Sequence, residues 1–167
     1  MTKMTGKVAL ITGGTSGIGL ATALQFVANG AQVAIAGRNV ERGEAALAQL
    51  KDAGGDAIFV PTDVSNASDV ENLVKTVISS FGHLDYAFNN AAAPPATSSM
   101  GPLINLTEDQ WDTTLDVNLK GVWLAMKYEI PVMLENGGGV IINNSSTAGG
   151  KGMAGLGAYA ASKHGLN

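Results

Sequence analysis

Short apolar runs alternate along the chain with longer segments of helical periodicity. The runs are rich in β-branched residues and indicate strands, whereas the longer segments repeat apolar residues every three or four positions and indicate helices. We expect strands at 8–12, 32–36, 57–60, 84–89 and 140–145, and helices at about 18–28, 40–53, 69–81 and 108–133. This alternation is typical of βαβ units and predicts a doubly wound α/β fold with a parallel, Rossmann-like sheet.

Local signals indicate where these helices begin and end. The glycines of Asn29-Gly30 and Gly54-Gly55 are natural helix stops, and Thr107-x-x-Gln110 has the form of a capping box. Pro131 should kink the long helix or end it, because proline lacks the amide hydrogen and its ring clashes with the preceding turn. The segment 92–100 is expected to be an exposed loop.

A glycine-rich turn follows the first predicted strand and opens the first helix. It reads Gly13-Gly14-Thr15-Ser16-Gly17-Ile18-Gly19. Glycines at 13, 17 and 19 allow a tight turn and let a pyrophosphate approach the amides at the helix start, where the dipole favours negative charge. A purely structural turn is equally compatible with these residues alone. The turn is neither a P-loop, which ends in Gly-Lys-Ser/Thr, nor a Gly-x-Ser-x-Gly nucleophile elbow.

Tyr159 and Lys163 stand four residues apart, so that in a helix their side chains share one face. A free phenol has a pKa of about 10, too high to exchange protons well near neutrality. A cation roughly 5 Å from a phenolate, at an effective dielectric constant of about 20, stabilises it by roughly 3 kcal/mol. The pair therefore predicts a tuned acid/base; the alternative is an exposed tyrosine and lysine on a solvated helix face.

These motifs resemble those of the short-chain dehydrogenase/reductase family. The family's Thr-Gly-x-x-x-Gly-x-Gly matches 12–19, its Asn-Asn-Ala-Gly matches 89–92 with Ala92 in place of glycine, and its catalytic tetrad matches Asn118, Ser146, Tyr159 and Lys163. The similarity runs from about Thr5 to the last residue. It implies an NAD(P)(H)-dependent oxidoreductase that moves hydride between a nicotinamide and an alcohol or carbonyl carbon. The methyl group of Ala92 puts the path of the following loop in doubt.

The resemblance assigns a role to each member of the tetrad. Tyr159 would be the general acid in carbonyl reduction and the base in alcohol oxidation, assisted by Lys163, which would also bind the nicotinamide ribose. Ser146, thirteen residues before Tyr159, would donate a hydrogen bond to the substrate oxygen, with Ser145 as the competing candidate. Asn118 would bend the long helix and hold a water that links Lys163 to solvent; the alternative is an amide on the helix surface.

The resemblance also implies a dinucleotide site at the carboxyl ends of the strands. Asp63 and Val64 follow the third strand, and the Asp63 carboxylate would accept from the adenine amine, although a helix-capping aspartate is the alternative. Ala92 would crowd the cofactor if it lay against it. The residues expected to bind the cofactor are Gly13, Thr15, Ser16, Gly17, Ile18, Gly19, Arg38, Asp63, Val64, Asn90, Ala91, Tyr159 and Lys163.

Arg38 determines which cofactor we expect. An acidic residue at the end of the second strand would bind the ribose hydroxyls of NAD, but this chain has Gly37 and then Arg38. A guanidinium can bind a 2′-phosphate through charge-assisted hydrogen bonds, each worth roughly 1.5 to 3 kcal/mol. We therefore favour NADP(H), with NAD(H) as the alternative because an arginine at a helix start can also be merely solvated.

Composition limits the remaining classes of protein. With 167 residues, 46% hydrophobic and 14% charged, the chain is long enough for one well-buried domain. A net charge of −4 without a basic run argues against nucleic-acid binding. The sequence has neither a long apolar run nor a secretory leader, so we expect no membrane association and a cytoplasmic location. It has no cysteine, and His83 and His164 are far apart, so no metal site is expected and both histidines are taken as surface or packing residues.

The chain ends four residues beyond Lys163, where the family's domain continues with further strands. We expect a single dinucleotide-binding and catalytic domain over 1–167, truncated at its C-terminal end, with the fifth strand at an exposed edge. The family implies a small alcohol or carbonyl substrate, whose identity the sequence does not give, and a homo-oligomer, tetramer or dimer. The alternatives are a non-catalytic dinucleotide-binding or interaction protein on the same fold, or an inactive fragment.

Overall fold

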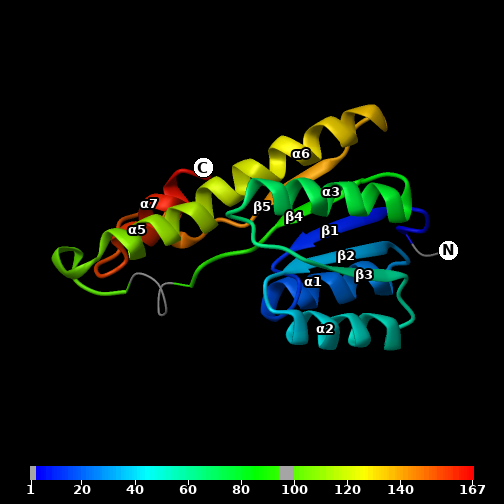
Figure 1. Cartoon of the computed structure of the whole chain (residues 1–167), viewed down its shortest axis with the longest axis horizontal. Coiled ribbons are helices and arrows are strands. Elements are labelled where there is room, and N and C mark those ends of the chain that lie inside the picture. Colours follow the sequence, from blue (N-terminus) through cyan, green and yellow to red (C-terminus); the bar gives the residue numbers. More distant parts are fainter. Residues whose placement is uncertain (1–2, 95–99) are drawn as a thin grey trace.

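The computed structural model describes residues 3–94 and 100–167. Five parallel strands form one sheet in the order β3-β2-β1-β4-β5 (Figure 1). The strands are β1 (Val8–Thr12), β2 (Gln32–Gly37), β3 (Ala57–Pro61), β4 (Tyr86–Asn89) and β5 (Val140–Asn143). The helices are α1 (Gly17–Ala28), α2 (Val40–Asp52), α3 (Ala67–Phe81), α5 (Glu108–Leu115), α6 (Gly121–Glu135) and α7 (Gly157–His164). The predicted loop 92–100 lies partly outside the described residues.

Helices cover both faces of the sheet, with α1 and α2 on one face and α3 and α6 on the other (Figure 1). Alternate residues of each central strand point to opposite faces. On β1, Ala9 and Ile11 pack with the helix residues Ala23 and Leu50, whereas Val8 and Leu10 pack on the other side with Val77. All these side chains are buried, and the doubly wound α/β fold predicted from the sequence is confirmed.

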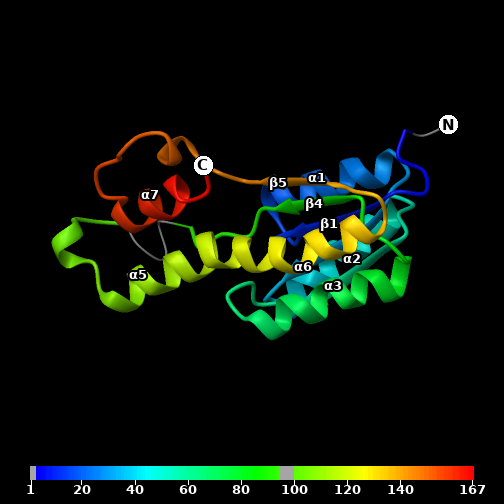
Figure 2. The same ribbon diagram turned by 90° about the horizontal axis from the view of Figure 1, so that it is seen from above.

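The long helix expected at 108–133 is interrupted. A π-helical turn, Asp116–Lys120, separates α5 from α6, and Figure 2 shows the two helices following each other as one rod that reaches beyond the sheet. The capping box of Thr107 and Gln110 is present at the start of α5. The helix does not end at Pro131 but continues to Glu135. Pro131 and Lys127, whose carbonyl loses its helical partner, are both exposed, so water can replace the missing bond.

β5 lies at the edge of the sheet, as the sequence predicts. Its apolar side chains Val140 and Ile142 are 51% and 57% exposed. In the part of the chain that the structure describes, no helix combines the length and the apolar character that crossing a bilayer requires. Nor do His, Cys, Asp and Glu side chains gather there in a group that could hold a metal ion.

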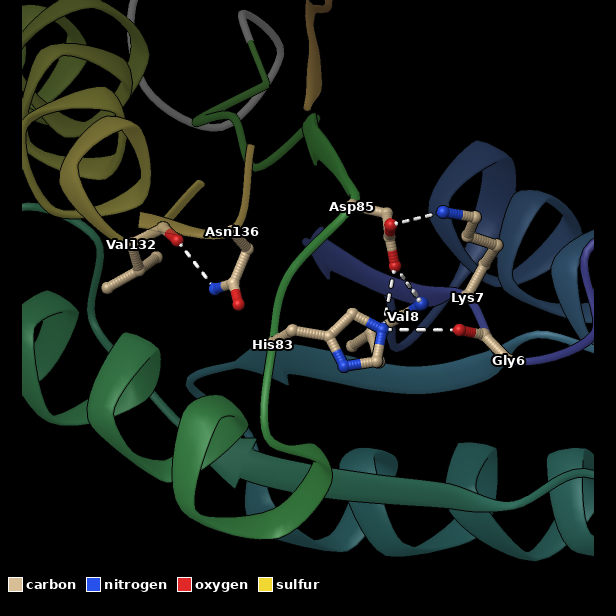
Figure 3. A network of polar contacts seen from close by, with 7 residues as sticks. All are labelled: Gly6, Lys7, Val8, His83, Asp85, Val132 and Asn136. Atoms are coloured by element: carbon tan, nitrogen blue, oxygen red, sulfur yellow. Dashed lines mark hydrogen bonds and ion pairs between the residues drawn. The ribbon is translucent and has the colours of Figure 1, made fainter. Parts of the chain in front are cut away.

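Asp85 ties the amino ends of β1 and β4 together (Figure 3). Its carboxylate accepts from Lys7 Nζ at 2.7 Å and from the buried Val8 amide at 2.9 Å. His83 Nε2 lies 3.0 Å from Asp85 Oδ2 and 3.2 Å from the Gly6 carbonyl oxygen, so this histidine belongs to the same polar network. Burial raises the pKa of Asp85, but the hydrogen bonds from Lys7 and Val8 outweigh it, and the pKa falls below its ordinary value. The network lies at the end of the sheet opposite to the expected site.

Candidate functional site

The glycine turn between β1 and α1 needs glycine for reasons of conformation and of space. Gly13 and Gly17 have φ angles of +65° and +53°, in the left-handed region that other residues avoid. A Cβ atom on Gly19 would lie 2.2 Å from the carbonyl oxygen of Gly13, whereas a Cβ on Gly17 would meet no atom within 4 Å. Among the described residues, the Ser16 side chain makes no capping hydrogen bond, which leaves the first amides of α1 to other acceptors. The turn is therefore tightly packed at Gly19 and open at Gly17.

A cavity of about 340 Å³ opens in front of this turn, at the carboxyl edge of the sheet. Eight of the predicted cofactor-binding residues line it, and they come from the ends of four strands. These are Gly13, Thr15, Ser16, Arg38, Asp63, Val64, Asn90 and Ala91. The structure adds lining residues that the sequence analysis did not select, namely Gly37, Asn39, Arg42, Thr62, Ala92 and Val117. The other predicted cofactor residues, Gly17, Ile18, Gly19, Tyr159 and Lys163, do not line this cavity.

Two arginines and one aspartate set the charge of the cavity. Arg38 Nη1 lies 3.9 Å from Asp63 Oδ2. Burial raises the pKa of Asp63. The hydrogen bonds from the Ser65 hydroxyl and amide, together with the charge of Arg38, lower it by more, so the pKa is below its ordinary value. Arg42 lies in the first turn of α2, four residues after Arg38, and this short spacing is the signal by which the sequence could have revealed it.

Asp63 is not the cap of the helix that follows it. The N-cap of α3 is Asn66, whose side chain accepts from the amides of Ser68 and Asp69. Asp63 instead accepts from the amide and the hydroxyl of Ser65. The capping alternative raised from the sequence is therefore not what the structure contains, and the carboxylate faces the cavity.

Asn90 and Thr12 join the ends of β4 and β1 beside the glycine turn. Thr12 Oγ1 accepts from the amides of Asn90 and Ala91 at 3.0 and 3.2 Å. The Asn90 side-chain amide donates to the carbonyl oxygens of Thr12 and Gly13, both at 3.3 Å. Thr12 is buried. These bonds fix the turn against the strand that ends in Asn90 and Ala91.

Asn118 lies within the π-helical turn and is completely buried. Its Oδ1 accepts from the amide of Ala93 at 2.7 Å, and its Nδ2 donates to the Ser162 hydroxyl at 3.2 Å. The alternative of an amide on the helix surface is therefore wrong. The side chain joins the segment after β4 to α7, and these tertiary bonds account for the interruption of the regular helix at a residue with low helix propensity.

Tyr159 and Lys163 both belong to α7, and the Lys163 Nζ lies 5.8 Å from the centre of the Tyr159 ring. Lys163 is only 3% exposed and donates to the main-chain oxygen of Asn144 at 2.6 Å. Burial lowers the pKa of Lys163 from its ordinary value. The pair is thus one buried cation beside one phenol, not two side chains on a solvated face.

The two serines after β5 are bonded differently. Ser146 Oγ accepts from the amide of Ala148 at 3.2 Å, which leaves its hydroxyl proton able to donate elsewhere. Ser145 Oγ donates to the main-chain oxygen of Lys163 at 3.3 Å, so its proton is already engaged.

An asparagine pair connects the cavity to α7. Asn90, which lines the cavity, accepts from Asn144 Nδ2 at 2.9 Å. Asn144 in turn accepts from Lys163 through its main-chain oxygen. One continuous set of hydrogen bonds therefore runs from the glycine turn to the buried lysine.

The cavity has the features that a bound dinucleotide requires. It offers a helix start for a pyrophosphate, cations at the end of β2 and an anionic acceptor in Asp63. Gly13 and Ser16 place the end of the glycine turn at the wall of this cavity. The residues present therefore fit a nicotinamide dinucleotide.

Comparison with known proteins gives the same result for the sequence and for the fold. The profile of the short chain dehydrogenase family matches residues 7–167. The 2,5-dichloro-2,5-cyclohexadiene-1,4-diol dehydrogenase of Sphingobium indicum is 42% identical over 165 residues, which is 98% of this chain and 64% of that enzyme. The chain thus spans less than two thirds of the length of this relative.

Solved structures match as closely. An actinorhodin polyketide ketoreductase with NADPH superposes with a TM-score of 0.91 at 36% identity, over 96% of this chain and 60% of that chain. An NAD+-bound xylitol dehydrogenase superposes with a TM-score of 0.93 at 33% identity, over 98% of this chain and 62% of that chain.

Proposed function

The chain belongs to the short chain dehydrogenase family, and on this premise we propose that it is the cofactor-binding and catalytic part of an NAD(P)(H)-dependent oxidoreductase. The reaction interconverts a small alcohol and its carbonyl compound. One observation carries the proposal: the hydrogen bonds Asn90–Asn144–Lys163 join a cavity that fits a dinucleotide to a buried cation beside a tyrosine. The bound nicotinamide supplies or accepts the hydride.

Tyr159 is the proton donor in carbonyl reduction and the acceptor in alcohol oxidation. The Lys163 ammonium, held 5.8 Å from the ring centre, favours the phenolate that forms when the proton leaves. Ser146 donates its hydroxyl hydrogen bond to the substrate oxygen. Ser145 does not take this role, because its hydroxyl already donates to the main-chain oxygen of Lys163.

Asn118 contributes by position. Its bonds to Ala93 and Ser162 hold α7, the helix that carries Tyr159, against the segment that follows β4. The water link from Asn118 to Lys163 that the family resemblance implies stays a prediction.

NADP(H) is the cofactor that we propose, with NAD(H) as the alternative. Arg38 and Arg42 both line the cavity where β2 ends, and together they supply donors for a 2′-phosphate. Asp63 acts against this, since its carboxylate lies 3.9 Å from Arg38 and would repel the phosphate. Two cations against one anion leave a net positive charge, which supports the phosphorylated cofactor. The cytoplasmic location and the homo-oligomer stay predictions.

The experiment compares Tyr159→Phe with the unchanged protein on a panel of small carbonyl compounds with NADPH. Turnover should fall at least about a hundredfold, which is the usual contribution of a general acid. Cofactor binding should remain, because the phenyl ring is kept. Tyr128→Phe is the matched control, since Tyr128 lies on α6 beside α3 and does not line the cavity. Unchanged turnover in Tyr159→Phe would refute the role of this residue, and NADPH binding without turnover in the unchanged protein would favour a non-catalytic binding protein.

A further inference from the structure

Glu129 is a carboxyl group buried in α6 that the proposed reaction does not use. It is 0% exposed, and with Lys163 it is one of the buried ionisable side chains in the described part of the chain. Burying an ionised carboxylate without a cation is costly. The contacts of Glu129 should therefore show how the protein avoids that cost.

The side chain of Asn89 is the hydrogen-bonding partner of Glu129. Asn89 Nδ2 donates to Glu129 Oε2 at 3.0 Å and to Asn143 Oδ1 at 3.1 Å. These two bonds assign the nitrogen of the Asn89 amide to the side that faces Glu129 Oε2 and Asn143 Oδ1.

Two polar atoms of this same pair are left without a partner. In the described residues, Asn89 Oδ1 and Glu129 Oε1 are the buried side-chain atoms that lack a hydrogen bond. If Glu129 were ionised, both would be acceptors and neither could satisfy the other. A single proton on Oε1 would supply the missing donor, and a bond from it to Asn89 Oδ1 would join the acid and the amide a second time.

The surrounding charges do not stabilise an ionised Glu129, because each already has another partner. Three ion pairs lie on the neighbouring elements: Glu71 with Lys75 on α3, Asp116 with Lys120 in the π turn, and Lys7 with Asp85 before β4. The Asp69 carboxylate accepts from the Asp63 amide. The Lys163 ammonium donates to the Asn144 main-chain oxygen. On α6, Lys127 lies over the rings of Trp123 and Tyr128. Burial raises the pKa of Glu129 to about 7, against the opposing effect of the Asn89 hydrogen bond.

The pair is also connected to the reacting lysine. Asn89 and Asn143 are register partners at the ends of β4 and β5. The amide of Asn144 donates to the Asn89 carbonyl oxygen at 2.9 Å, and the Asn144 carbonyl oxygen receives the Lys163 hydrogen bond at 2.6 Å. Only Asn89 and Asn144 therefore separate Glu129 from Lys163.

We infer that Glu129 carries a proton in the folded protein and acts as a neutral positioning residue. Its carboxyl group closes a two-bond pair with Asn89, and this pair holds the strand ends that place the Asn144 carbonyl under Lys163. The protonation state is independent of the proposed function, whereas the effect on turnover rests on it.

The first test measures the proton. The infrared spectrum of the folded protein below neutral pH should contain the carbonyl band of a protonated carboxyl group, shifted in D₂O and missing in Glu129→Gln. Glu135→Gln, which changes an exposed carboxylate on the same helix, should leave that band in place. A spectrum in which Glu129→Gln removes only an ionised carboxylate band would overturn the inference.

The second test follows the urea midpoint against pH. Glu129 holds more protons in the folded protein than in the unfolded chain between pH 4.5 and about 7, so its contribution to stability falls as pH rises through this window. Glu129→Gln, whose amide can donate to Asn89 Oδ1 at every pH, should remove that fall. If its midpoint kept the slope of the unchanged protein, Glu129 would not be the titrating group.

The third test separates positioning from mere packing. Glu129→Leu fills the volume but breaks the pair, and should lower turnover on the order of tenfold, whereas Glu129→Gln should retain it. The ratio of Glu129→Gln turnover to that of the unchanged protein should rise with pH, because only Glu129 ionises. Equal turnover and equal pH profiles in all three proteins would overturn the positioning role. If the proposed function itself fails, no variant turns over, while the infrared and midpoint results still decide the protonation state.

Discussion

The ammonium group of Lys163 donates to the main-chain oxygen of Asn144 over 2.6 Å. This bond joins α7 to the residue that follows β5, and it supplies a donor to the Asn144 carbonyl group. It also holds the cation beside the Tyr159 ring. Lys163 therefore has a structural contact that can be measured apart from any catalytic role.

Lys163→Met should destabilise the protein by about 1 to 3 kcal/mol near neutral pH, because the half-buried Asn144 oxygen then loses its charged donor. The difference should also depend on pH. Burial lowers the pKa of Lys163, so the unfolded chain binds the extra proton in the alkaline range below 10.5. The stability of the unchanged protein should therefore rise relative to Lys163→Met as pH increases through that range. Urea unfolding at a series of pH values measures this, with Lys75→Met on the surface of α3 as the control.

The two arginines of the chain give a test of cofactor choice. Replacing Arg38 with alanine should weaken NADPH binding by about 1.5 to 3 kcal/mol, which is roughly ten- to a hundredfold in Kd. Arg42→Ala should weaken it in the same direction, because both side chains line the cavity. NADH binding should change little in either variant.

Titration of cofactor fluorescence gives both dissociation constants. Lys51→Ala, which removes a cation at the far end of α2, is the control for a general loss of positive charge. Equal weakening of NADH and NADPH in Arg38→Ala would show that the guanidinium does not read the 2′-phosphate.

The repeating pattern of the sequence was enough to predict the layers of the fold. Val8 to Ile11 are apolar without alternation, as expected for a strand buried on both faces, and α1 and α2 end just before Gly30 and Gly54, as predicted. What the pattern could not predict depends on contacts between distant residues. The π turn at Asn118 results from bonds to Ala93 and Ser162, which no local propensity contains.

Two residues of the site region could have been found from their spacing. Glu129 is four residues from both Ala125 and Met133, which are buried, so a carboxylate stands on the apolar face of its helix. Arg42 stands four residues after Arg38, at the start of a predicted helix. The position of each residue in its helix follows from the sequence, but only the fold shows that Asn89 lies opposite Glu129 and that the cavity lies beside Arg42.

Gly19 and Gly17 should respond differently to alanine. A methyl group on Gly19 would lie 2.2 Å from the Gly13 carbonyl oxygen, so the turn must move, and Gly19→Ala should cost about 1 to 3 kcal/mol of stability. Gly17→Ala has space but keeps a φ of +53°, and should cost about 1 to 2 kcal/mol. Both should lose cofactor affinity.

Thermal unfolding with and without NADPH measures both effects. Gly150→Ala is the control, because its nearest neighbour atom would lie at 3.9 Å and its φ is negative. If Gly19→Ala were as stable as Gly150→Ala, the close packing behind the turn would not be a constraint.

Asp85 should make the protein sensitive to acid at the end of the sheet away from the site. Its pKa is lowered in the folded protein because the hydrogen bonds from Lys7 and Val8 and the charges of Lys7 and His83 outweigh burial. A lowered pKa gives stability that is present above the unfolded value of about 3.9 and is lost as pH falls through the folded value. The stability difference between the unchanged protein and Asp85→Asn should therefore shrink as the solution becomes acidic.

Asp85→Ala should be less stable than Asp85→Asn by about 1 to 3 kcal/mol at every pH. In the alanine variant the buried Val8 amide has no side-chain acceptor, whereas asparagine retains one. Urea unfolding of the three proteins from neutral to acidic pH measures both effects, and Asp52→Asn at the end of α2 is the control. A stability difference between the unchanged protein and Asp85→Asn that stayed constant with pH would mean that the Asp85 charge does not stabilise the fold. The joint between β1 and β4 would then depend on hydrogen bonding alone.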